Sequence, residues 1–210
     1  MWRDGSSHQV LSRLLRLIGR TNSPQSPWDR TRMRVPKTAF GPGSRQDFAL
    51  YFEGESSVRV QSIGDITAWL LQCEYVSDPD LFDKGDFWQH PTVFEQLRRG
   101  DCEDFALWAW RKLAEIGMEA EFYVGRVIGC AEPELDRHHA WVVYRDESIE
   151  FLFEPAASSS QQMIRPLDEV RHAYVPHFAV NQRLDTSAFA GCTHDLRRDT
   201  ARRSRATARS

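Results

Sequence analysis

One helix pattern followed directly by three strand patterns constrains the fold of this chain most strongly. Residues 102–116 carry apolar side chains at helical spacing, and Gly117 is a typical residue for ending a helix. Residues 120–128, 139–145 and 148–154 have the composition and length of short strands. This order and content predict an α+β fold, with helices packed on an antiparallel sheet.

The remaining patterns predict one folded unit between two basic ends. A further helix is expected at residues 63–73, within a folded unit that spans residues 46–184. Residues 1–45 are predicted to be a basic extension that contains a short amphipathic helix and a Pro- and Gly-rich linker. Residues 185–210 form an Arg-rich tail that we expect to be disordered.

Charge is distributed unevenly along the chain. Of 27 basic and 30 acidic residues, 13 basic and 3 acidic ones lie in residues 1–36 and 197–210. This leaves 14 basic and 27 acidic residues in residues 37–195, a formal charge of -13. A region this acidic repels phosphates, so nucleic acid is not an expected partner, and any contact with it would involve the Arg-rich ends.

The cysteines and the apolar segments bear on the compartment. The four cysteines include no CxxC pair and are too few for a disulfide-stapled secreted domain, which favours a reducing compartment. They are Cys73, Cys102, Cys130 and Cys192. No apolar stretch is long enough to span a bilayer, so we expect a cytoplasmic protein without a membrane span.

Cys102 is the best candidate for a reactive group because it stands at the start of a predicted helix. The free N–H groups of a first helical turn favour an anionic sulfur and can also face a developing oxyanion. The neighbouring Asp101, Glu103 and Asp104 oppose this effect, because their negative charges raise the pKa of a thiol. A catalytic Cys102 therefore needs a cationic partner, and His139 is the candidate.

The predicted hairpin suggests a third residue that could orient His139. If Asp146 and Glu147 form a two-residue turn, Arg145 lies opposite Ser148, and His139 lies opposite Glu154. Directly opposed Cβ atoms are about 4.5 to 5.5 Å apart, within reach of a carboxylate and an imidazole. His138, the neighbouring alternative, would point to the opposite face of the sheet.

These residues lie in sequence blocks that resemble a known family. The blocks are Arg-Gly-Asp-Cys-Glu-Asp-Phe-Ala around Cys102, His-Ala-Trp-Val-Val from His139 and Phe-Glu-Pro around Glu154. They resemble the Cys, His and Asp blocks of the transglutaminase-like superfamily. Together with Asp-Phe-Trp-Gln-His-Pro-Thr-Val-Phe-Glu around Trp88, they look especially like the bacterial transglutaminase-like cysteine proteinases. The resemblance covers about Trp88 to Pro155, and Glu154 departs from the family's usual Asp.

The resemblance implies a papain-like α+β fold, with a nucleophile at a helix N-terminus that packs on an antiparallel sheet. It implies a cysteine peptidase or amidase that performs thiol acyl transfer on peptide or glutamine amide bonds of a protein or peptide substrate, by hydrolysis in the simplest case. Cys102 would be the nucleophile, His139 the base and Glu154 the residue that orients the base.

Two further roles are expected around this triad. The backbone N–H of Cys102 is one candidate oxyanion donor, and the side chain of Trp88 or Gln89 is a candidate for the second. No cofactor is required. By the resemblance, Asp101 and Glu103 match positions that bind calcium in some members, although two acids fall short of the six to eight oxygen ligands of this ion.

Two alternatives compete with the catalytic interpretation. Cys102, Cys130, His138 and His139 could hold zinc, but their spacing lacks the short ligand pair with cysteine of most structural zinc sites. The same fold could also be a catalytically inactive protein-binding module, which the Glu in place of Asp and the acids around Cys102 favour.

Overall fold

The helix predicted at residues 102–116 is helix α5, Cys102–Glu115, in the computed structural model, which describes residues 26–128 and 138–193. The carboxylate of Asp104 accepts a hydrogen bond from the backbone N–H of Asp101 (3.3 Å), which caps the start of the helix. Gly117, at φ +78°, follows its end as predicted. Trp108, Trp110 and other residues of α5 are fully buried, so the helix lies inside the core.

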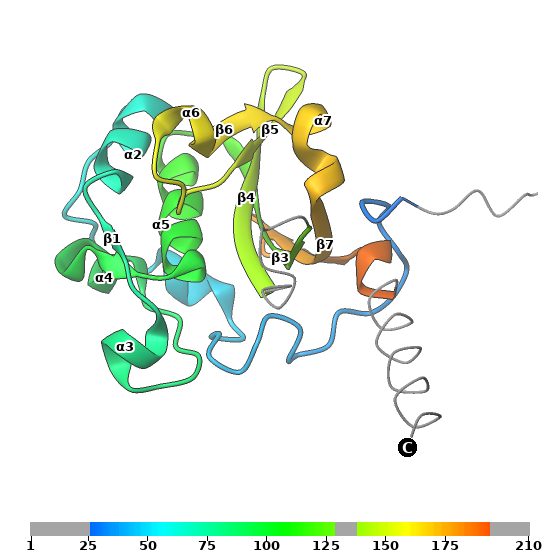
Figure 1. Cartoon of the computed structure of the whole chain (residues 1–210), viewed down its shortest axis with the longest axis horizontal. Helices are drawn as coiled ribbons and strands as arrows, with labels where there is room; N and C mark the ends of the chain where they lie inside the picture. Colours follow the sequence, from blue (N-terminus) through cyan, green and yellow to red (C-terminus); the bar gives the residue numbers. More distant parts are fainter. Residues whose placement is uncertain (1–25, 129–137, 194–210) are drawn as a thin grey trace, which may run out of the picture.

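A six-stranded sheet packs against α5 (Figure 1). Its strand order is β6-β5-β4-β3-β7-β8, and every neighbouring pair is antiparallel. The α+β class, with an antiparallel sheet on which the helix headed by Cys102 packs, is therefore confirmed. The strands are β3 Glu119–Val127, β4 His138–Asp146, β5 Ile149–Phe153, β6 Ile164–Pro166, β7 Tyr174–Asn181 and β8 Thr186–Ala188.

Shorter elements surround this sheet and α5. Helix α2 begins with a capping box between Ser62 and Asp65 and ends at Leu70, three residues before the predicted end. Strands β1 and β2 form a separate parallel pair. The elements are η1 Phe48–Phe52, α2 Ile63–Leu70, β1 Glu74–Tyr75, α3 Asp78–Phe82, α4 Pro91–Leu97, β2 Arg99–Gly100, α6 Ser160–Met163, α7 Leu167–Val170 and η3 Arg171–Ala173.

The two faces of the sheet bury different sets of side chains. Phe122, Val142 and Phe153 belong to the cluster that includes α5, whereas Trp141 and Leu152 belong to a second cluster. The second cluster also contains side chains of α7 and, at its margin, Trp28. Both faces are therefore covered by apolar side chains, which explains why the central strands are rich in apolar residues at successive positions.

The packed residues reach beyond the interval 46–184 on both sides. Residues 26–45 contain no helix, in keeping with their Pro-rich composition. They nevertheless pack on the folded unit: the ring centroids of Trp28 and Tyr123 are 5.7 Å apart, and those of Phe40 and Phe48 are 4.7 Å apart. Beyond residue 184, Phe189 is 2% exposed. The predicted amphipathic helix near the N-terminus and most of the Arg-rich tail lie outside the described residues.

The predicted register of the β4–β5 hairpin is wrong by two residues. Asp146 pairs with Ile149 and Val142 with Phe153, so the two-residue turn consists of Glu147 and Ser148. Glu147 adopts a φ of 51°, the left-handed conformation that such a tight turn requires. A shift of two residues leaves every side chain on its predicted face, so Glu154 lies diagonally from His139 rather than opposite it.

No helix among the described residues combines the length and the apolar character needed to cross a membrane.

A buried ion pair connects α4 to α5. The Lys112 Nζ lies 3.1 Å from the Glu95 Oε1, and both side chains are at most 1% exposed. Glu95 also accepts hydrogen bonds from the Trp108 indole N–H (3.0 Å) and the Ser57 backbone N–H (2.8 Å). Burial raises the pKa of Glu95, but its hydrogen bonds outweigh burial and lower the pKa to about 2.

We expect Glu95→Gln to lower the free energy of unfolding by about 3 to 5 kcal/mol, because it leaves the buried Lys112 charge without its partner. The stabilisation is present above about pH 4.5 and is lost as pH falls towards about 2, since the folded carboxylate has the lower pKa. Urea denaturation at several pH values measures both effects. Glu115→Gln is the control, because Glu115 contacts the same lysine from a position that is 35% exposed. Equal losses in the two variants would contradict this account.

Candidate active site

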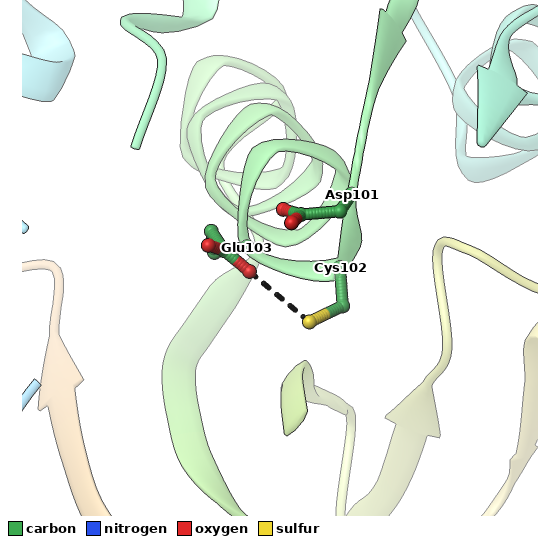
Figure 2. Close-up of side chains that lie close together, drawn as sticks. All are labelled: Asp101, Cys102 and Glu103. Carbon is green, nitrogen blue, oxygen red and sulfur yellow. Dashed lines mark hydrogen bonds between the residues drawn. The ribbon is translucent and has the colours of Figure 1, made fainter. Parts of the chain in front are cut away.

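Cys102 is the first residue of α5 and its side chain faces strand β4. The thiol is 9% exposed and donates a hydrogen bond to the Glu103 Oε2 (3.1 Å), as Figure 2 shows. The backbone N–H of Ala140 in β4 lies close enough to the sulfur to lower the pKa of the thiol. The predicted nucleophile therefore lies at a helix N-terminus and contacts the strand that carries His139.

His139 and Glu154 are in direct contact at one end of the sheet. His139 belongs to β4, Glu154 follows the last residue of β5, and the His139 Nε2 lies 2.7 Å from the Glu154 Oε2. Burial lowers the pKa of His139, but the Glu154 carboxylate raises it above its ordinary value overall. The contact uses Nε2, so Nδ1 is the nitrogen that can exchange a proton with a thiol.

The thiol and the imidazole share a neighbour but are not joined. Ala140, whose backbone N–H lowers the pKa of the thiol, directly follows His139 in the chain. Among the hydrogen bonds of residues 26–128 and 138–193, none connects Cys102 to His139. Burial raises the pKa of the Cys102 thiol well above its ordinary value, and the charges of Glu103 and Asp101 raise it further. In this state Cys102 is a protonated thiol.

Buried acids surround Cys102 on the side of α3. Asp101, Cys102 and Glu103 form one group of potential metal ligands. Asp78 belongs to two further groups, one with Asp101 and Asp104 and one with Asp86 and Glu103. Within each group the potential ligand atoms lie within 4.8 Å of one another. Figure 2 shows Asp101 and Glu103 on either side of the helix start. The sequence analysis assigned no role to Asp78 or to Asp86, although Asp86 is the first residue of the Trp88 block.

These acids resist ionisation. Burial raises the pKa of Glu103 to about 10 and that of Asp104 to about 8, and it raises the pKa of Asp78 to about 6. The Oδ1 atoms of Asp78 and Asp101 are buried and have no hydrogen-bond partner within residues 26–128 and 138–193. Closely spaced carboxylates with unused oxygen atoms are the donors that calcium prefers. These residues therefore fit the calcium ion that the resemblance associates with the positions of Asp101 and Glu103.

Trp88 and Gln89 do not offer free oxyanion donors. The Trp88 indole N–H donates to the Asp86 Oδ1 (2.9 Å), and its ring packs in the core. The Gln89 amide donates to the backbone carbonyl of Arg99 (2.9 Å) and to the Asp104 carboxylate. A Cβ at Gly100 would lie 2.7 Å from this amide, which explains the glycine before Asp101. Gln89 therefore supports the segment that precedes α5, whereas Trp88 packs in the core.

The residues of the zinc alternative are not assembled in the described part of the chain. His138 is exposed and its ring lies 6.0 Å from that of His177. Cys130 lies outside the described residues. The groups of described side chains that could hold a metal contain acids and Cys102 but no histidine.

Comparisons with known proteins give structural neighbours only. No family model matches the chain, and no curated protein matches its sequence. The chain is similar in structure to EGTA-treated LapG of Legionella pneumophila, a transglutaminase-like cysteine protease, with 21% identity and a TM-score of 0.45. This match covers 60% of the chain and 63% of LapG, so the chain spans less than two thirds of that protein.

Two further structures are similar to the chain. Calcium-bound LapG of Legionella pneumophila is 21% identical over 59% of this chain and 65% of LapG, with a TM-score of 0.44. A proposed cysteine protease from Cytophaga hutchinsonii is 13% identical over 61% of this chain and 40% of its own, with a TM-score of 0.38.

We expect the free energy of unfolding, measured without metal ions, to fall as pH rises from about 4 towards about 8. The folded chain binds more protons than the unfolded chain in this window, because the pKa values of Asp78, Glu103 and Asp104 are raised by burial. Asp104→Asn should reduce the slope, as measured by urea denaturation in EGTA, whereas Asp80→Asn on the exposed side of α3 should not. A wild-type stability that rises over this window would contradict the assignment.

Proposed function

We propose that this protein is a cysteine peptidase or amidase, which performs thiol acyl transfer on peptide or glutamine amide bonds with Cys102 as nucleophile, His139 as base and Glu154 as its orienting acid. The contact of 2.7 Å between the His139 Nε2 and the Glu154 Oε2, on the strand against which the helix headed by Cys102 packs, is the observation that carries this proposal. The substrate is a protein or peptide.

The reaction would proceed in two half-reactions. His139 takes the thiol proton at Nδ1, and the sulfur attacks the carbonyl carbon of the amide. The C–N bond then breaks as His139 returns the proton to the leaving amine, which leaves a thioester on Cys102. In hydrolysis His139 takes a proton from water as the oxygen attacks the thioester carbon. The C–S bond then breaks, His139 returns the proton to the sulfur, and the acid leaves. Glu154 keeps Nε2 protonated and so holds Nδ1 free for these transfers.

Two backbone groups support this chemistry. The N–H of Cys102 at the start of α5 is the candidate oxyanion donor, because the first N–H groups of a helix have no partner within it. The Ala140 N–H lowers the pKa of the thiol and so favours the attacking thiolate. The two groups come from a helix start and a strand that are packed together, so their positions are fixed by the core.

We propose further that Asp101, Glu103, Asp78 and Asp86 hold a calcium ion. The spacing of the carboxylates supports this site, as do the Oδ1 atoms of Asp78 and Asp101, which have no partner in the described part of the chain. When bound, the ion would supply positive charge that offsets the acids around Cys102.

The first test of the function is the rate at which iodoacetamide alkylates Cys102 between about pH 5 and 9, located by peptide mass spectrometry in buffer with calcium. We expect fast alkylation below neutral pH that is lost in His139→Ala, because the imidazolium stabilises the thiolate. His138→Ala is the control, since His138 is exposed beside His139. Cys73, whose pKa burial raises to about 12, should react slowly in every sample. An ordinary thiol profile for Cys102, unchanged by His139→Ala, would refute the proposal.

The second test is a thermal shift with calcium or with EGTA. We expect calcium to raise the melting temperature, with a stabilisation of about 2.7 kcal/mol when the ion is at a hundredfold of its dissociation constant. Asp78→Asn should abolish the shift and Asp80→Asn on the same helix should leave it intact. An equal shift in both variants, or none in the wild type, would argue against the site.

One observation favours a protein-binding module as the second candidate. The Cys102 thiol donates to Glu103, and its pKa is raised by burial and by acids. Both features oppose a thiolate. A protein that does not use Cys102 for catalysis would lose no function by retaining them. The alkylation profile separates the two candidates, because a binding module needs no reactive thiol.

A further inference from the structure

The Glu154 carboxylate has a second hydrogen-bond donor besides His139. The phenol O–H of Tyr174 donates to the Glu154 Oε2 (3.2 Å), the same oxygen that lies 2.7 Å from the His139 Nε2. The other oxygen of Glu154, Oε1, is buried and has no hydrogen-bond partner among the described residues. The orientation of the carboxylate is therefore set by two bonds to one oxygen.

Tyr174 is itself held firmly. Its ring lies 5.2 Å from the Trp141 ring, in an edge-on arrangement, and its backbone carbonyl accepts a hydrogen bond from the Trp28 indole N–H (3.1 Å). The positive charge of Arg165 in β6 lies near the phenol and lowers its pKa, although burial and Glu154 outweigh this effect. Trp141 in turn stacks beside His139, at 6.1 Å between ring centroids. Tyr174 is 5% exposed, so its phenol has little access to competing water.

A glutamate needs such support more than an aspartate does. Its side chain has one more rotatable bond, so more conformational freedom is lost when its carboxylate is held in one place. The phenol keeps its proton, since burial and the Glu154 charge raise its pKa far above neutral pH, and it remains a donor. Loss of the phenol would leave the carboxylate held only by the imidazole that it has to orient.

We propose that Tyr174 is a positioning residue for the reaction of Cys102: its phenol fixes the Glu154 carboxylate, which in turn fixes the ring and the tautomer of His139. This inference rests on the proposed function for its catalytic consequence, but the contact between phenol and carboxylate can be tested without any activity. Tyr174 is the first residue of β7, and strands β4 and β3 lie between β7 and β5 in the sheet. The spacing of residues in the sequence therefore did not indicate that Tyr174 contacts Glu154.

The experiment compares Tyr174→Phe with Tyr123→Phe in the full chain. The Tyr123 phenol also donates to a glutamate, Glu121 (2.8 Å), and its ring also packs on Trp141 (5.9 Å), but it has no contact with Glu154. The two variants remove the same atom from the same side of the sheet. Two quantities are measured: the alkylation rate of Cys102 by iodoacetamide at neutral pH, and the tautomer of His139 from the ¹⁵N chemical shifts of its ring.

We expect Tyr174→Phe to lower the alkylation rate about tenfold, as the loss of a hydrogen bond to a charged group implies, and to convert a single Nε2–H tautomer into a mixture. Tyr123→Phe should change neither quantity. In a Glu154→Gln background the additional effect of Tyr174→Phe should vanish, because Tyr174 acts only through Glu154.

The inference fails if Tyr174→Phe leaves the His139 tautomer and the alkylation rate at their wild-type values, or if its effect persists undiminished in Glu154→Gln. Failure of the proposed function gives a different result. There, Cys102 of the wild type would show no His139-dependent alkylation, while the tautomer measurement would still decide whether Tyr174 holds the pair of Glu154 and His139.

Discussion

Burial of helix α5 is the constraint on which the rest of the structure depends. Its tryptophans fill the core between α2, α4 and the sheet, so the first turn of the helix cannot shift relative to β4. Cys102 consequently faces β4 near the backbone N–H of Ala140, and the residue before Ala140 is His139. The candidate active-site residues are thus placed by the packing of apolar side chains several residues away. The buried pair of Lys112 and Glu95 connects α5 to α4.

The start of α5 combines two opposing electrostatic requirements. Acids at a helix N-terminus stabilise the helix through its dipole, and Asp104 also holds the preceding loop through Gln89. The same acids oppose a thiolate at Cys102, because like charges at short range raise the pKa of the thiol. A bound cation would satisfy both requirements, since it compensates the carboxylates without removing them. Helix stability and thiol reactivity are therefore coupled through one cluster of acids.

Side-chain periodicity predicted correctly which face of the sheet a residue lies on, but not which residues are paired across the hairpin. His139 and Glu154 were assigned to one face, and this assignment survives the register error because it depends only on odd and even positions. The turn itself was misplaced by one residue, since Glu147 adopts a left-handed conformation that composition does not indicate. Trp88 was selected for its indole N–H, but a neighbouring carboxylate, Asp86, uses that donor. Local spacing does not report which acceptors the fold brings nearby.

The sequence by itself determined the helix headed by Cys102, the three strands after it and the common face of His139 and Glu154. These follow from local propensity and periodicity, which are properties of neighbouring residues. Only the tertiary structure decided that Asp78 joins the acids beside Cys102 and that Tyr174 donates to Glu154. Both contacts connect segments about 20 residues or more apart in the chain, and such contacts depend on how helices and strands pack, because no local pattern specifies them.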